Sequence, residues 1–255
     1  MRTAPYGRIL FGAAAVLFGV IALMWHDADT WQSLARIWRA PFGSVLGDSL
    51  MALGIAGGAG LAFRRTVRAA STLLVVVYAL ACVICIGGIA AAPKLFDSYD
   101  GFFEQFALLC GAIAVYAAAQ RDAARTAALE RAARIGIGLC AIVFMLAQIV
   151  YPAVTAELVP AWLPPNQTFW ATLTTVAFGL AAVAILINVR ARLALNLMTL
   201  MLALFGLLVW VPRVIAHPGS HGTWSEFALN YLITGAVWVV AAGVRGVPSS
   251  VRRPV

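Results

Sequence analysis

GRILFGAAAVLF (residues 7–18) and ARIGIGLCAIVF (residues 133–144) share one pattern of arginine, glycine and apolar residues. The two segments agree at Arg8/Arg134, Ile9/Ile135, Gly12/Gly138, Ala15/Ala141 and Phe18/Phe144. A second pair, GAIAVYAA (111–118) and GAVWVVAA (235–242), occupies corresponding places later in the chain. Similarity at a nearly fixed separation is the sign of an internal repeat. The sequence therefore predicts two copies of one structural unit.

Each copy consists mainly of apolar segments. Hydrophobic residues make up 63% of the chain and charged residues 11%, whereas a soluble domain is about half apolar and about a quarter charged. A membrane-spanning helix needs about 20 apolar residues, and a helix satisfies its own backbone hydrogen bonds in lipid. Eight segments meet this requirement: Ile9–Trp25, Ser44–Phe63, Ala69–Ala91, Phe102–Ala119, Ile135–Tyr151, Gln167–Ile187, Leu193–Ile215 and Glu226–Val244. We expect an all-α, polytopic membrane protein with eight transmembrane helices, whose first partner is the lipid bilayer.

The cations gather in one set of loops between these segments. If the N-terminus is cytoplasmic, 14 of the 18 Lys and Arg residues fall on the cytoplasmic side: Arg2, Arg8, Arg64, Arg65, Arg68, Arg121, Arg125, Arg131, Arg134, Arg190, Arg192, Arg245, Arg252 and Arg253. The other side receives Arg36, Arg39, Lys94 and Arg213. This asymmetry follows the positive-inside rule and places both termini in the cytoplasm. It also explains the net charge of +8 without a nucleic-acid partner.

The eight segments divide into two units of four. The first unit covers residues 1–119, and the second covers residues 135–255 with a short basic C-terminal tail. Residues 120–134 (QRDAARTAALERAAR) form a charged, helix-favouring cytoplasmic linker. Because four is an even number, each unit enters and leaves the membrane on the same side. The two four-helix bundles are therefore expected to be parallel repeats.

The Gly, Arg and Pro residues between the spans resemble those of the DoxX family of small bacterial membrane proteins. The resemblance rests on GRILFG in the first span, on FRRTVRAAS (63–71) and INVRARLAL (187–195), on Pro93 and Pro218, and on the Gly-Ala pair within each fourth span. It extends over nearly the whole chain, which would be a double-length member of the family. The resemblance implies a four-helix bundle in each unit and a place in the bacterial inner membrane.

The same resemblance implies an accessory function. The family's name comes from an association with a thiosulfate:quinone oxidoreductase. We therefore expect a component of a membrane redox or sulfur-oxidation system that contacts quinone or a membrane or exoplasmic redox partner protein. Two alternatives stay open, a non-catalytic membrane scaffold and a small-solute transporter. The sequence contains no self-contained catalytic constellation, so it names no catalytic residue and does not predict an enzyme.

IAHPGSHGTWSE (215–226) is the most polar stretch of the chain and contains two of the three histidines. His217 and His221 have the spacing of a helical metal pair, but the Pro-Gly dipeptide between them disfavours a helix. The stretch fits an outer turn, with a ligand site as the alternative, and no metal is predicted. Thr223 and Glu226 have the spacing of a capping box, which would begin the last helix there.

Two charged residues near the outer face are the other candidates. Arg213 lies just inside the end of the seventh segment, where it must snorkel or find an anionic partner, because a charge deep in the bilayer costs ~2.5 kcal/mol or more. Its alternative role is contact with an anion or a quinone carbonyl. Asp48 could cap the second helix, pair with Arg213 or hold a proton. The candidate ligand-binding residues are therefore Asp48, Arg213, His217 and His221.

The four cysteines lie within apolar segments. Cys82 and Cys85 form a C-x-x-C pair in mid-segment, whereas a thioredoxin-like pair opens a helix. No second pair completes a zinc site, and Cys110 and Cys140 stand alone. We interpret all four as packing residues. The sequence identifies no bound cofactor, and quinone is the one cofactor that the resemblance suggests.

Overall fold

The computed structural model describes residues 5–25 and 42–244. All regular structure in these two ranges is helical. In chain order the helices are α1 (Pro5–Trp25), α3 (Gly43–Gly60), α4 (Val67–Ala91), α5 (Phe96–Ala118), α6 (Ala123–Val150), α7 (Pro152–Leu158), α8 (Gln167–Leu186), α9 (Ala191–Phe205), the π-helix η2 (Gly206–Trp210), α10 (Val211–Ala216) and α11 (His221–Gly243). The predicted basic tail lies outside the described residues.

Seven helical segments of the described chain are long and apolar enough to cross a membrane. This confirms an all-α, multi-pass membrane protein. One of the seven is the continuous segment Ala191–Ala216, which contains α9, η2 and α10. The predicted second span is not among them, because its helix α3 has only 18 residues and carries Asp48 and many glycines. Length and composition therefore do not confirm the eighth span.

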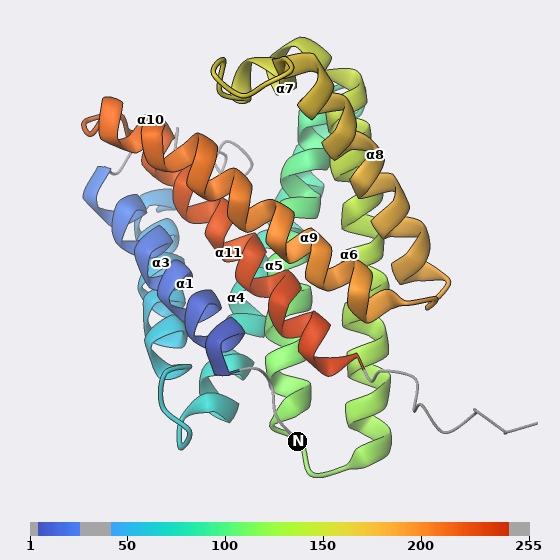
Figure 1. Cartoon of the computed structure of the whole chain (residues 1–255). Coiled ribbons are helices and arrows are strands. Elements are labelled where there is room, and N and C mark those ends of the chain that lie inside the picture. The colour runs from blue at the N-terminus through green and yellow to red at the C-terminus, as the bar shows by residue number, and fades with distance from the viewer. Residues whose placement is uncertain (1–4, 26–41, 245–255) are drawn as a thin grey trace, which may run out of the picture.

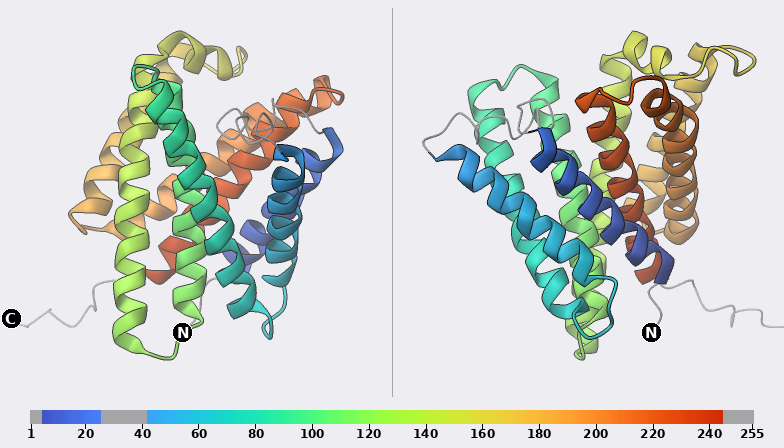
Figure 2. Two further views of the ribbon diagram at one scale, coloured as in Figure 1. Left: turned by 180° about the vertical axis from the view of Figure 1, so that it is seen from behind. Right: turned by 90° about the vertical axis from the view of Figure 1, so that its left-hand side faces the viewer.

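The helices of each half pack one on the next in a series, and the two series contact each other through their inner helices. In the first half α1 packs on α3, α3 on α4 and α4 on α5; in the second half α6 packs on α8, α8 on α9 and α9 on α11. Between the halves, α1 packs along α11, α5 packs along α6, and α5 also contacts α11. Figures 1 and 2 show the outcome: α3 and α4 lie at one edge, α8 and α9 at the opposite edge, and the other long helices between them.

Both described ends of the chain lie on the same side of the bundle. Figure 1 shows that α1 begins and α11 ends near its lower edge. This side is called the terminal side below. The opposite side, where α5, α8 and α11 begin, is called the distal side.

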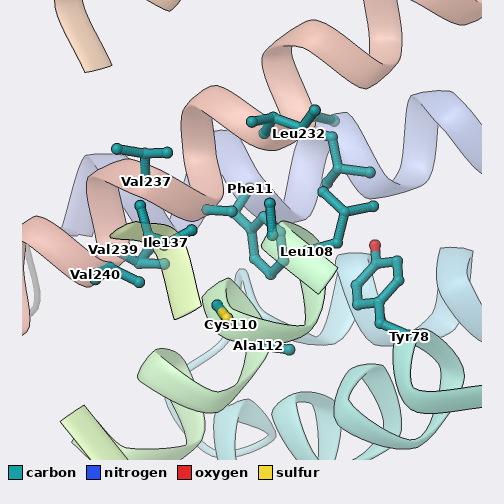
Figure 3. Close-up of a cluster of buried hydrophobic side chains, with 14 of the residues drawn as sticks. Phe11, Tyr78, Leu108, Cys110, Ala112, Ile137, Leu232, Val237, Val239 and Val240 are labelled. Atoms are coloured by element: carbon teal, nitrogen blue, oxygen red, sulfur yellow. The ribbon is translucent and has the colours of Figure 1, made fainter. Parts of the chain in front are cut away.

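The middle of the bundle is the main apolar core. Phe11 of α1, Leu108 of α5, Ile137 of α6 and Leu232 of α11 are fully buried, and Figure 3 shows them converging from four helices. Residues that are far apart in the sequence thus meet in one core. This core holds the two halves together as one body.

Helices within each half approach closely where a side chain is missing. Gly12 of α1 faces Gly58 of α3, and Gly138 of α6 faces Ile185 and Leu186 of α8. Small residues allow such close crossings in membrane bundles. Gly12 and Gly138 are corresponding positions of the sequence repeat, so the repeated glycine makes the equivalent helix crossing in each half.

The repeated arginine also has a structural partner in the second half. Arg134 is buried, and its guanidinium donates hydrogen bonds to the carbonyl oxygens of Ile185 and Leu186 at the end of α8. The last carbonyls of a helix lack donors within the helix, so Arg134 supplies them from α6. The charged linker leads into the same helix: Asp122 caps α6 through the amides of Ala124 and Arg125.

Candidate acidic pocket

Three carboxylates lie near one another at the distal side. Asp100 and Glu104 are one turn apart on α5 and therefore share a face, while Glu226 lies in the second turn of α11. All three line one pocket of about 280 Å³. Electrostatic repulsion acts between Glu226 and each of the other two acids. The N-terminal halves of two helices thus place three acids around one space.

Polar and aromatic side chains from the second half form the other walls. Gln148 of α6 is held by the hydroxyls of Thr174 and Thr175 of α8, which donate to its Oε1 atom at 3.2 and 2.7 Å. The aromatic lining residues are Phe144, Tyr151, Phe178, Phe205 and Trp210. An apolar pocket with a few convergent polar groups is the usual form of a small-molecule site.

Two oxygen atoms of the pocket walls are buried without a hydrogen-bond partner among the described residues. They are an Oδ1 atom of Asp100 and the Oδ1 atom of Asn230, and the Asn230 side chain as a whole is 9% exposed. Burial of an unpaired acceptor is unfavourable. Both residues line the pocket, so a ligand that donates hydrogen bonds there would relieve the cost.

The π-helix shapes the wall opposite Asn230. Pro212 has no amide hydrogen, and its ring clashes with the carbonyl one turn earlier. The wide turn η2 directly precedes it, which is a common accommodation in membrane helices and is often found at functional sites. A Cβ atom on Gly206 would lie 2.6 Å from Asn230 Oδ1. Glycine at this position therefore leaves room for the Asn230 and Tyr231 side chains against η2.

No Lys, Arg or His residue is among the described residues that line this pocket. The charged groups that act on the acids of the pocket are other acids, which repel them in their ionised forms. Asp97, beside Asp100, is one of these groups. Asp97 itself bonds the Tyr151 hydroxyl, and this bond raises the pKa of Tyr151. The pocket thus gathers three acids whose ionised forms repel one another, and the unpaired oxygen atoms of Asp100 and Asn230 add hydrogen-bond acceptors.

The residues singled out in the sequence lie outside this pocket lining. Arg213 donates a 3.1 Å hydrogen bond to the backbone carbonyl of Glu157, and its guanidinium carbon lies 5.5 Å from the ring centroid of Trp210. Among the described residues, Arg213 thus contacts a carbonyl and an aromatic face. Asp48 is half-buried on α3, a helix that packs on α1 and α4 and not on the pocket helices.

The two histidines have different surroundings. His217 is exposed and follows α10, whereas His221 is buried as the first residue of α11 and stacks on Trp25, with ring centroids 5.1 Å apart. The turn between them confirms that no single helix carries both. Within the described contacts, His221 serves the packing of α11 on α1.

The predicted capping box is wrong. Helix α11 begins at His221, two residues before Thr223, and its N-cap is Ser220, whose Oγ atom accepts a hydrogen bond from the Thr223 amide. Glu226 therefore lies inside the helix and lines the pocket. The interpretation failed because Ser220 offers an earlier cap that a Thr-x-x-Glu pattern does not exclude.

The sequence did contain a signal for the other two acids. Asp97, Asp100 and Glu104 are spaced three and four residues apart, which is the period of one helix face. The sequence predicts a span that starts at Phe102 and therefore leaves Asp100 in a loop. The observed start at Phe96 brings all three into α5.

The cysteines are buried in the described bundle. Cys110 faces Gly136 of α6, where it occupies the space left by the missing Cβ atom. No group of three or more His, Cys, Asp or Glu residues within the described ranges could hold a metal ion.

Comparison with protein-family models, with curated proteins and with solved structures finds no match for the chain. The chemistry of the pocket is therefore the basis for assigning a function.

Proposed function

We propose that the protein is a membrane transporter or receptor for a small solute, and that the acidic pocket binds this solute as a cation. The proposal develops the transporter alternative of the sequence analysis. Three carboxylates without a lining cation carry it. Charges of one sign in a partly enclosed pocket attract the opposite charge and repel their own.

The lining also selects the kind of cation. A metal ion would require carboxylates close enough to share it, and the described residues contain no such group. An organic ammonium needs hydrogen-bond acceptors and gains from aromatic faces through cation–π contact. The free Oδ1 atoms of Asp100 and Asn230 supply the acceptors, and aromatic lining residues such as Phe144 and Phe178 supply the rings.

Two features of the fold belong to the same proposal. We take α3 as an eighth crossing and the halves as parallel repeats, because every packing contact of the first series has a counterpart in the second and both described ends share one side. The positive-inside rule then puts the terminal side in the cytoplasm. The acidic pocket would open toward the exoplasmic side.

A matched set of three ligands tests the proposal. Benzylammonium, benzyl alcohol and benzoate share one ring and differ in charge, and each is small enough for the pocket. With purified protein in phosphatidylcholine nanodiscs, ligand-observed NMR should give the tightest dissociation constant for benzylammonium and no binding for benzoate. Equal affinity for the cation and the alcohol would refute charge selection.

Variants locate the binding on the pocket. Glu104→Gln and Glu226→Gln each remove one charge and keep the side-chain shape, and each should weaken benzylammonium binding about tenfold or more. Glu157→Gln is the control, because its carboxylate is exposed at the distal side and only its backbone makes a described contact. If the three variants bind alike, the pocket is not the site.

The redox function implied by the DoxX resemblance stays a prediction. A quinone carbonyl is a hydrogen-bond acceptor and requires donors, whereas the two unpaired buried atoms of the pocket are themselves acceptors. A quinone should therefore fail to displace benzylammonium. Displacement of benzylammonium by ubiquinone-1 would favour the redox function over this proposal.

A further inference from the structure

A long apolar groove follows the seam between α8 and α9 on the edge of the bundle. It consists of two hollows of about 500 and 370 Å³ that share Ala177, Leu197 and Met201. The first hollow reaches Arg190 near the terminal side, and the second reaches Val159 and Leu163 near the distal side. The groove thus runs along most of the membrane-spanning length of α8.

The turn that connects α8 to α9 lies at the terminal end of this groove and has an unusual backbone. Asn188 and Arg190 both have left-handed backbone conformations, with φ angles of 59° and 50°. Leu180, Leu197 and Leu200 on the two helices are more than 45% exposed. In a membrane these side chains face hydrocarbon, so an apolar chain is the natural occupant of the space between them.

The groove and the acidic pocket share a wall. Thr174, Met201 and Phe205 line both the distal hollow and the pocket. Met201 is a flexible, unbranched side chain at the junction of all three spaces. The pocket and the groove are therefore adjacent, with the Met201 side chain between them.

From this adjacency we infer that the ligand of the pocket is an amphiphile, with an ammonium head group and a hydrocarbon chain, and that it reaches the pocket sideways from the bilayer past the flexible Met201 side chain. This inference rests on the proposed function and names its substrate class. The head binds the carboxylates and the unpaired oxygen atoms of Asp100 and Asn230. The chain lies between α8 and α9, where no charged side chain lines the distal hollow.

The test adds a tail to the ligand of the previous experiment. N-dodecylbenzylammonium and N-methylbenzylammonium carry the same charged head, and both are measured by displacement of labelled benzylammonium in phosphatidylcholine nanodiscs. The dodecyl compound should displace the label at a concentration at least tenfold lower, after correction for its partition into empty nanodiscs. Equal corrected potency of the two compounds would overturn the inference.

Blocking the groove separates the two proposals. Ala177→Phe fills the point where the hollows join, and it should weaken the dodecyl compound about tenfold while benzylammonium binding stays unchanged. Val176→Phe is the control, because Val176 is the next residue on α8, is 53% exposed and lines neither the groove nor the pocket. Dodecyl binding that is equally strong in all three proteins would overturn lateral access.

The remaining outcomes are also decisive. If benzylammonium fails to bind the unmodified protein, the proposed function itself falls, and the inference falls with it. If benzylammonium binds and depends on Glu104 but the tail adds nothing, the proposed function stands and the amphiphile is excluded. Should Ala177→Phe disturb the fold, Leu197→Trp blocks the same junction from α9, and benzylammonium binding again reports whether the variant is intact.

Discussion

Gly12 and Gly58 face each other so closely that a Cβ atom on either one would lie 2.6 Å from the carbonyl oxygen of the other. The contact joins α1 to α3, and neither backbone can yield without moving a whole helix. A methyl group at this crossing is therefore an overpacked contact, which typically costs about 1–3 kcal/mol. We expect Gly12→Ala and Gly58→Ala each to lower the midpoint of thermal unfolding in detergent by several degrees.

Gly54 is the matched control for these two variants. It lies on the same helix α3, and a Cβ atom there would have no neighbour within 4 Å. Alanine in a helix is favoured over glycine by about 0.5–1 kcal/mol, so Gly54→Ala should leave the midpoint unchanged or raise it. Equal decreases of the unfolding midpoint in all three variants would mean that any glycine-to-alanine change in these helices destabilises the protein, whether or not it lies at the crossing.

Arg134 predicts a second stability effect. Its two hydrogen bonds to the end of α8 are charge-assisted, and bonds of this kind contribute about 1.5–3 kcal/mol. Arg134→Gln should lower the unfolding midpoint, and Arg134→Lys should lower it less because an ammonium still donates. Arg131→Gln removes an exposed charge from the same helix that repels Arg134, so it should leave the midpoint unchanged or raise it slightly. A neutral Arg134→Gln would show that water replaces these bonds.

The bond between Tyr151 and Asp97 predicts a dependence on high pH. Asp97 stabilises the protonated phenol, so the pKa of Tyr151 lies above its ordinary value of 10.0. This contribution to stability is complete below pH 10 and is lost as the pH rises through the raised pKa. Ultraviolet titration, taken as the difference from Tyr151→Phe, should show the Tyr151 transition moving to lower pH in Asp97→Asn. A transition that does not move would contradict the bond.

Gly206 predicts an effect on the pocket. A Cβ atom there would meet Asn230 Oδ1 at 2.6 Å and the ring of Tyr231 at 2.8 Å. Gly206→Ala should displace Asn230 and weaken benzylammonium binding severalfold, with a loss of thermal stability. Gly222→Ala, at a position where a Cβ meets nothing within 4 Å, should bind normally. Normal binding by both variants would show that Asn230 makes no contact with the ligand.

The helical class and the places of the long segments followed from the sequence because lipid forces each apolar stretch to satisfy its own backbone. Helix α3 marks where this reasoning weakens. Asp48 and the glycines of α3 reduce its apolar character. The close packing of Gly58 on Gly12 compensates for the small side chains, but it depends on the partner helix α1 as well as on α3. Hydropathy along one segment does not contain that information.

The pocket was much less predictable. The sequence places Asp100 in a loop and Glu104 at the start of a span, because Phe96, Ser98 and Tyr99 are not typical of a membrane segment. In the structure, however, α5 begins at Phe96. Glu226 was given a capping role that Ser220 performs. Convergence of α5 and α11 depends on packing between residues more than 100 positions apart, and no periodicity within either segment reveals it.

The π-helix η2 has a further consequence for how α10 is oriented. One extra residue in a turn advances every later side chain by about 100° around the helix axis. Trp210 and Arg213 consequently occupy angular positions around the helix axis that other residues would occupy in a regular α-helix. Removing a single residue between Gly206 and Trp210 would leave the composition of the segment almost unchanged. It would nevertheless rotate the Trp210 indole out of the pocket lining and break the contact between Arg213 and Glu157. In this stretch the number of residues sets the direction of the later side chains, beside the requirement for glycine at position 206.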